Sequence, residues 1–429
     1  MQAFYNRLMS LLSSWQILYV LTAALSVGIF YARSLVSITT GTLLAIGLLS
    51  LVDAERRHAL SRRKEIIYVM GVFVVYALSV LLSQDQSKWL SQLNIGLPYL
   101  GIPLGLTAFV VDRRRLVHLL SIFIAATTVS ACIITGDYLL HWQEYNDLYK
   151  FGQTIPTPIL HVRYSYFVAL ACCLAVGLWY DHRPSAQWQR RTLGAVALFL
   201  FVFLHVLAVR TGLFACYAGL FMIMLVAAMR QGNWRLAAGM GVLILGVFAA
   251  GYWMLPSLRN KIDYMRHDLK VLVQQGALPQ YSDNTRVISY QHGLTLFLRH
   301  PVLGAGIGDV TNDIAEIYER DTPQFPAERR YLPESDYLYW LATFGLVGTV
   351  VILGLLLYPL GLYWRRSYLL IGLYAVTLAS SFGVTTLQLQ LGKTAFLVLL
   401  CIILQYCRSQ VIGQPVVTPV RPVGDDLVQ

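Results

Sequence analysis

Apolar residues in this chain come in long runs instead of alternating with polar residues. A helix needs about 20 mainly apolar residues to cross the hydrocarbon core of a bilayer. Because backbone groups cannot be left unpaired in lipid, such runs must be helical. The pattern predicts about twelve spans, near 15–31, 35–52, 66–83, 92–111, 116–138, 164–180, 192–209, 211–229, 236–255, 337–358, 368–383 and 391–406. We therefore expect an all-α integral membrane protein.

The connection between the ninth and tenth spans is the one segment long enough to fold beside the membrane. Its apolar residues recur at helical spacing, first at Leu258, Ile262 and Met265 and again at Tyr290 and Leu294, so it should contain amphipathic helices. The predicted organisation is nine spans over 1–255, a large helical loop over 256–336, three spans over 337–408 and a tail over 409–429.

Composition and charge agree with a membrane protein and orient it. Hydrophobic residues make up 57% of the chain and charged residues only 13%, and the mean hydropathy is +0.58. The formal net charge of +11 collects at one set of span ends, for example in 56–64, 113–115 and 365–366. Cytoplasmic loops carry an excess of Lys and Arg, so we expect both termini in the cytoplasm and the large loop on the opposite face. No basic patch stands apart from the span ends, so no nucleic-acid partner is expected.

Three arginines at the outer ends of predicted helices are candidates for binding an anion. Arg210 stands between the seventh and eighth spans, where an arginine is costly unless it meets an anion or lines a wet cavity. Its planar fork suits phosphate oxygens. Arg286 opens a predicted loop helix, and Arg163 follows a Pro-Thr-Pro turn and His161 at the entry to the sixth span. The alternatives are an interfacial side chain for Arg210 or Arg163 and, for Arg286, a solvated charge or a partner of Asp283.

Two carboxylates at the start of the tenth span, Glu334 and Asp336, could accept a proton from a sugar hydroxyl. An N-terminal helix cap would explain Ser335 or Asp336 without any catalytic role. His161 is a weaker candidate, and His205, in the middle of a span, fits a helix–helix hydrogen bond. The sequence contains no HExxH, CxxC, P-loop or serine-nucleophile motif, so we infer no metal and no cofactor.

A glycine-rich stretch at 301–308 follows the second stripe of the loop. Its three glycines at alternate positions allow either close approach to a ligand or a tight turn that returns the chain to the membrane. It follows a predicted helix and not a strand, which argues against a dinucleotide-binding fingerprint.

The order of these features resembles the O-antigen ligase and polymerase superfamily. The resemblance rests on 209–212, on Thr285-Arg286 followed by the 301–308 stretch, and on 337–348, which reads YLYWLATFGLVG. It covers roughly 200–350 in detail and the twelve-span layout throughout. The segment 155–163 further resembles members from Bacteroidetes. Each motif is short, and their order together with the topology carries the resemblance.

The resemblance implies an enzyme of the bacterial inner membrane that works on its periplasmic face. Members take a glycan from an undecaprenyl-pyrophosphate carrier and transfer it to lipid A–core (ligases), to another glycan (polymerases) or to protein. Arginines matching Arg210 and Arg286 are thought to hold the pyrophosphate, and we add Arg163 and His161 as candidate substrate-binding residues. Members usually carry a His-Asn pair where this chain has Glu334-Ser335. Glu334 could replace that histidine, Asp336 or His161 could supply the base, or the activity could have been lost.

A multi-span transporter is the alternative from another functional class. Twelve spans suit many carriers, but carrier folds usually show internal repeats and broken helices at corresponding places. We find no such repeat, and an outer loop of this length is unusual for them. The sequence therefore favours a metal-independent glycan transferase.

Overall fold

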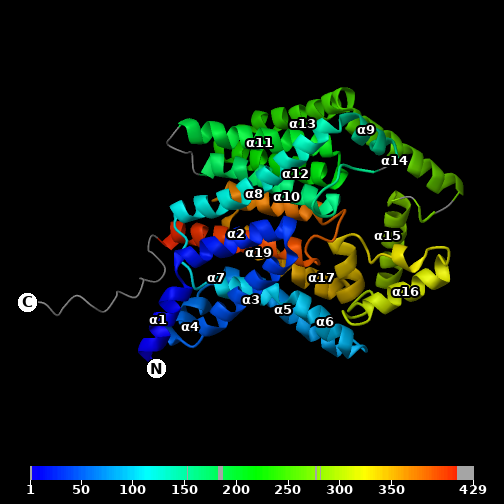
Figure 1. The fold of residues 1–429 in the computed structure, drawn as a ribbon. Helices are drawn as coiled ribbons and strands as arrows, with labels where there is room; N and C mark the ends of the chain where they lie inside the picture. Colours follow the sequence, from blue (N-terminus) through cyan, green and yellow to red (C-terminus); the bar gives the residue numbers. More distant parts are fainter. Residues whose placement is uncertain (1, 152, 182–186, 276–277, 281, 413–429) are drawn as a thin grey trace, which may run out of the picture.

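The computed structural model describes residues 2–151, 153–181, 187–275, 278–280 and 282–412. All regular structure within these ranges is helical (Figure 1). Up to the large loop the elements are α1 (Gln2–Leu12), α2 (Trp15–Tyr31), α3 (Arg33–Ser50), α4 (Ala54–Ser61), α5 (Lys64–Leu78), η1 (Ser79–Leu81), α6 (Gln86–Gly96), α7 (Pro98–Leu106), α8 (Arg113–Leu140), α9 (Trp142–Lys150), α10 (His161–Asp181), α11 (Gln187–Leu207), α12 (Arg210–Gln231) and α13 (Trp234–Met254).

The remaining elements are α14 (Pro256–Gln275), α15 (Ser282–Arg299), α16 (Val310–Asp321), η2 (Ala327–Arg329), α17 (Asp336–Tyr363), α18 (Tyr368–Ser380) and α19 (Gln390–Ile412). The segment 256–336 thus contains helices, as its apolar stripes predict. Of the predicted tail, 409–412 belong to α19 and the rest lies outside the described residues.

Eight of the described helices are long and apolar enough to cross a membrane, namely α3, α5 extended by η1, α8, α10, α11, α12, α17 and α19. The shorter α2 and α18 are also apolar. The chain is therefore an all-α, multi-pass membrane protein. The predicted span at 92–111 differs from the others because it is divided between α6 and α7 at Pro98. Proline lacks the amide hydrogen that a continuous helix needs and its ring disturbs the preceding turn.

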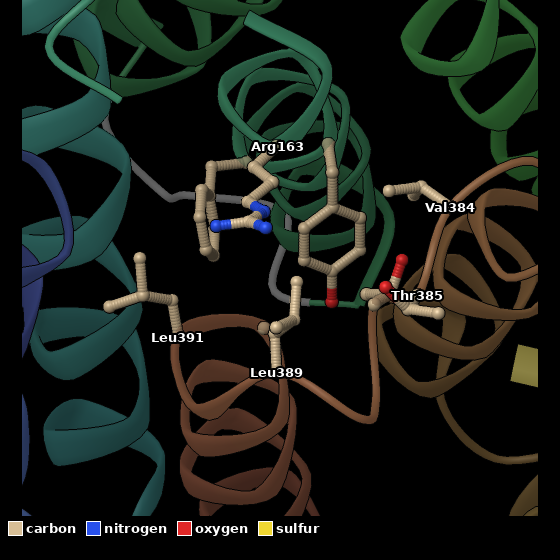
Figure 2. Close-up of a pocket in the computed structure, with 9 residues that line it drawn as sticks. Arg163, Val384, Thr385, Leu389 and Leu391 are labelled. Atoms are coloured by element: carbon tan, nitrogen blue, oxygen red, sulfur yellow. The ribbon is translucent and has the colours of Figure 1, made fainter. Parts of the chain in front are cut away.

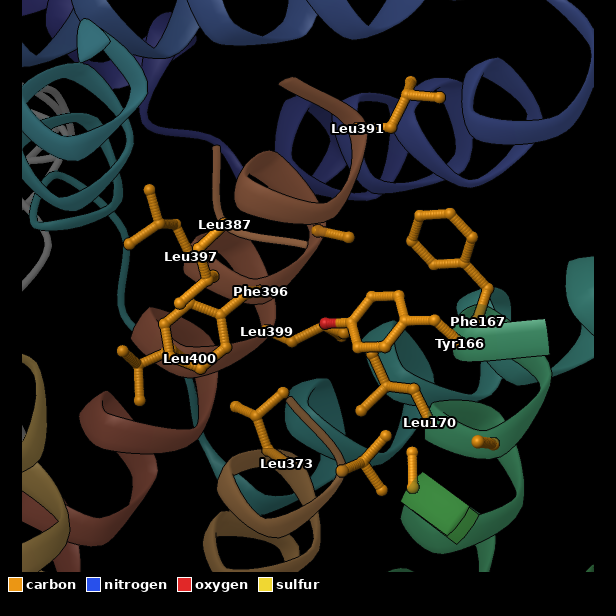
Figure 3. Packing of buried hydrophobic residues seen from close by; sticks show 14 of the residues in the cluster. Tyr166, Phe167, Leu170, Leu373, Leu387, Leu391, Phe396, Leu397, Leu399 and Leu400 are labelled. Carbon is orange, nitrogen blue, oxygen red and sulfur yellow. The ribbon is translucent and has the colours of Figure 1, made fainter. Parts of the chain in front are cut away.

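The two most enclosed spans, α10 and α19, form the centre of the bundle. In their apolar segments 78% and 83% of the residues are buried. Figure 3 shows Tyr166, Phe167 and Leu170 of α10 packed with Phe396 and the surrounding leucines of α19 and α18. The start of α12 also lies close to α10, because a Cβ atom added at Gly212 would stand 2.4 Å from the Cβ of Ser165. This small residue brings the N-terminal ends of the two helices together.

The glycine-rich stretch 301–308 fills a break in α17. The helix is interrupted at Gly345, whose φ of 64° lies in the left-handed region. The amides of Ala305 and Gly306 donate to carbonyls before the break, each at 2.9 Å, and the amide of Leu346 after it donates to the carbonyl of Pro301 at 2.9 Å. The turn therefore satisfies backbone groups that the break leaves free. Of the two interpretations of this stretch, the structure supports the turn.

Candidate active site

The predicted site residues lie at or beside the N-terminal ends of four helices. His161 and Arg163 open α10, Arg210 is the first residue of α12, Arg286 lies in α15, and Glu334 and Asp336 stand at the start of α17. Ala208, just before α12, has a φ of 53° and is the one non-glycine residue with positive φ among the described positions. This strained turn lets α12 begin directly after α11.

Each of the two arginines of the resemblance pairs with a carboxylate. The guanidinium of Arg210 forms an ion pair with Asp283, which lies 73 positions later in the first turn of α15. The Nε of Arg286, one turn further along that helix, donates to Oε2 of Glu334 at 2.9 Å. Burial alone would lower the pKa of Arg286, but the charge and hydrogen bond of Glu334 outweigh it, and the pKa is raised. The two arginines thus lie at the same end of α15.

The main chain of Glu334 is held separately from its side chain. Its amide lies 3.4 Å from the Oγ of Ser289, and its carbonyl oxygen lies 3.2 Å from the hydroxyl of Tyr290. The same hydroxyl lies 3.1 Å from the carbonyl oxygen of Phe382. Arg286, Ser289 and Tyr290 follow one another at helical spacing on α15, so a single face of this helix holds both the main chain and the side chain of Glu334.

A buried carboxylate on α14, Asp268, orients the beginning of α15. It is fully buried and accepts a hydrogen bond from the amide of Asp283 at 3.0 Å. With its amide group correctly oriented, the side chain of Asn284 donates to the other oxygen of Asp268 at 2.9 Å. Burial raises the pKa of Asp268. The sequence does not single out Asp268, because nothing in it indicates which residue of another helix contacts the start of α15.

A third cation, Lys261 of α14, lies near both arginines. Burial lowers the pKa of Lys261 to about 8, and the positive charge of Arg210 acts in the same direction. Asp283 and Asp268 oppose the shift. Lys261 and Arg286 are also the charges that act on His161, so His161 lies on the same side of the molecule as the arginine pairs. In the sequence alone Lys261 belongs to the polar side of a predicted amphipathic helix, and nothing there indicates that it approaches the two arginines.

Asp336 has a different environment from Glu334. It is fully buried, and its Oδ2 accepts hydrogen bonds from the hydroxyl of Ser381 at 2.7 Å and from the amides of Thr386 and Leu387 at 2.9 Å. Its Oδ1 accepts from the amide of Gln388 at 3.1 Å. The carboxylate therefore holds the connection between α18 and α19 against the start of α17 through hydrogen bonds. This arrangement favours an anchoring role over that of a base.

Lys393 is a buried charge within the spanning helix α19. Its ammonium donates to the carbonyl of Ile95 at 2.8 Å and lies 5.6 and 5.1 Å from the ring centres of Tyr76 and Tyr99. Asp336 is the acidic group whose charge acts on it. A lysine in a predicted span can be recognised from the sequence as unusual, because a charge is costly in lipid. The sequence does not show that Tyr76 and Tyr99 face it.

Arg163 borders a small pocket between α10, the α18–α19 connection and the start of α19. Figure 2 shows its guanidinium facing Thr385 and Leu389 of that connection, with Leu391 beside it. Its buried Nε has no hydrogen-bond partner among the described residues. The charges of Arg33 and Glu334 act on Arg163. Arg163 thus lies within the influence of Glu334 but takes part in neither arginine–carboxylate pair.

Two further expectations concern histidine and metal. His205 bonds the hydroxyl of Tyr217 on the neighbouring helix through Nε2 at 2.5 Å, which confirms the expected helix–helix hydrogen bond. Within the described part of the chain, no group of three or more His, Cys, Asp or Glu residues could hold a metal ion.

Residues 195–353 match the family model described as O-antigen ligase. This match covers the region that carries the resemblance and supports the O-antigen ligase and polymerase superfamily. The matched segment runs from α11 into α17 and includes Arg210, Arg286 and Glu334, whereas His161 and Arg163 lie before it. A comparison with curated proteins found no match. The superfamily implies lipid-linked glycan substrates and a glycosyltransferase-like reaction.

Proposed function

We propose that this superfamily member is an O-antigen ligase that transfers a glycan from an undecaprenyl-pyrophosphate-linked donor to lipid A–core. The observation that carries the proposal is the pair between Arg286 and Glu334. It places the arginine expected at the phosphates within one hydrogen bond of the carboxylate that replaces the usual histidine. Arg210 stands near the same end of α15 through Asp283. The family match favours transfer over transport.

The proposed topology has twelve spans in the inner membrane, both termini in the cytoplasm and α14 to α16 in the periplasm. Figure 1 shows α14, α15 and α16 at one end of the molecule and α1 and α4 at the other. The basic residues of α4 and its flanks lie at the end away from the arginine pairs. This distribution supports the orientation that the charge pattern predicts.

In the proposed reaction, Arg210 and Arg286 bind the oxygens of the pyrophosphate, and Glu334 accepts the proton of the acceptor hydroxyl. The acceptor oxygen forms a bond with the anomeric carbon of the donor sugar while the bond from that carbon to the phosphate oxygen breaks. Undecaprenyl pyrophosphate leaves with the electron pair, and its growing negative charge is stabilised by the two arginines. The proton remains on Glu334 and passes to water when the site opens. No metal ion is required for these steps.

The surroundings of the candidate bases support Glu334. The carboxylate of Asp336 is buried and accepts four hydrogen bonds, so it has no access to an acceptor. The side chain of Glu334 is 33% exposed, and among the described residues its carboxylate has one hydrogen-bonded partner, Arg286. A polymerase or a protein O-oligosaccharyltransferase would use the same chemistry with a different acceptor.

Gene deletion followed by gel analysis of lipopolysaccharide tests the proposal and separates these activities. Loss of the whole ladder with lipid A–core intact is expected for a ligase, and a band with a single repeat would instead show a polymerase. Complementation with Glu334→Gln should not restore the ladder, because an amide keeps the shape but is not an effective base. Glu328→Gln removes an exposed carboxylate of the same loop and should restore it. An unchanged ladder after deletion would overturn the function.

A further inference from the structure

Both arginines proposed to bind the donor pair with carboxylates of the protein itself. Arg210 holds Asp283 and Arg286 holds Glu334. A guanidinium binds carboxylate and phosphate oxygens through the same donors and in similar geometry. The pyrophosphate of a donor would therefore compete with these side chains for the same N–H groups. Binding of the donor is then an exchange of anions.

The two carboxylates differ in how easily they can move. The side chain of Asp283 is only 10% exposed, and its main-chain amide is fixed by the buried Asp268. The side chain of Glu334 is 33% exposed, and the one hydrogen bond of its carboxylate goes to Arg286. Glu334 is therefore the partner that an incoming anion would displace.

The main chain of Glu334 would stay in place during such an exchange. The hydroxyl of Tyr290 lies within hydrogen-bonding distance of the carbonyl oxygens of Glu334 and Phe382, and the amide of Glu334 faces Ser289. Both holding residues belong to α15, as does Arg286. Displacement from Arg286 would thus turn the side chain of Glu334 without moving the start of α17.

We propose that the donor's pyrophosphate displaces Glu334 from Arg286 and so releases the base, and that Tyr290 is the positioning residue that confines this movement to the side chain. The inference rests on the proposed function. While Glu334 is paired, its charge is neutralised and its Oε2 is engaged, so it cannot activate an acceptor. Once the pyrophosphate takes its place on Arg286, the carboxylate is free to face the acceptor hydroxyl. The donor therefore binds before the acceptor is activated.

The exchange predicts that removing the charge of Glu334 increases the affinity for pyrophosphate. Glu334→Gln should bind inorganic pyrophosphate more tightly than the wild type, by about fivefold to tenfold, because Arg286 no longer gives up an ion pair. The measurement is calorimetric titration of the full chain in nanodiscs of phosphatidylcholine. Asp263→Asn removes the same charge from α14, where Asp263 pairs with the exposed Arg266, and should change the affinity by less than twofold. Unchanged or weaker binding by Glu334→Gln would overturn the exchange.

Failure of the exchange and failure of the proposed function give different results. Loss of the lipopolysaccharide ladder in Glu334→Gln without tighter pyrophosphate binding would leave Glu334 as the base but end the exchange. Tighter binding with a normal ladder would support the exchange and remove Glu334 as the base.

Tyr290→Phe tests the positioning role. It should keep pyrophosphate affinity within about twofold of the wild type and slow ladder formation about tenfold, because the ring is retained while the carbonyl oxygen of Glu334 loses the hydroxyl of Tyr290. A normal ladder in this variant would show that Tyr290 does not position Glu334. If Tyr290→Phe lowered pyrophosphate affinity as much as Arg286→Lys does, Tyr290 would be acting through Arg286 or through the stability of the fold.

Discussion

Replacing Asp336 with asparagine distinguishes an anchor from a base. The side chain of asparagine best fits the site with its oxygen in place of Oδ2, which accepts from Ser381 and two amides. Its amide group then faces the amide of Gln388, and one hydrogen bond at 3.1 Å is replaced by two opposed donors. A buried donor without a partner costs about 1–3 kcal/mol, and the three remaining bonds lose their charge assistance. We expect a total loss of about 2–4 kcal/mol.

Replacement with alanine removes all four acceptor contacts and should cost more than asparagine. Thermal unfolding of the purified proteins in nanodiscs should rank their stability, with the wild type highest, Asp336→Asn lower and Asp336→Ala lowest. The lipopolysaccharide ladder reports their activity in cells. Thr39→Val serves as a control, because this buried hydroxyl has no hydrogen-bond partner among the described residues. If Asp336→Asn unfolded like the wild type but abolished the ladder, Asp336 would be acting in the reaction, and the anchoring interpretation would be refuted.

Three further predictions concern topology, the donor site and pH. Cysteine at Lys270 should react with an impermeant thiol reagent from the periplasm and cysteine at Ser61 should not; the reverse would invert the orientation. Arg210→Lys and Arg286→Lys should each reduce the ladder at least about tenfold, because an ammonium loses the bidentate geometry, and full activity of both would exclude the pyrophosphate role. Pyrophosphate binding should weaken as pH rises through about 8, where Lys261 loses the charge it carries at lower pH, and Lys261→Met should lack this dependence when titrated in parallel.

The apolar helices and the positions of the candidate cations could be predicted because both depend on local chemistry. A long apolar run must become a helix in lipid wherever its neighbours lie, and Pro98 stands at the first position of α7, a position that proline favours. Arg210 and Arg286 stood out as charges at the ends of predicted helices, and Glu334 stood out because it occupies the position of a histidine in the superfamily. These properties belong to single segments, so the sequence alone determined them.

The partners of these residues were decided only by the tertiary structure. Arg210 meets Asp283 across 73 positions and Arg286 meets Glu334 across 48, and neither spacing leaves a periodic signal. The sequence leaves Asp336 as either a helix cap or a base, and only the packing of the α18–α19 connection shows that four donors surround it. A carboxylate becomes an anchor or a candidate base according to the groups that helix packing brings to it, and that packing depends on contacts between helices distant in the chain.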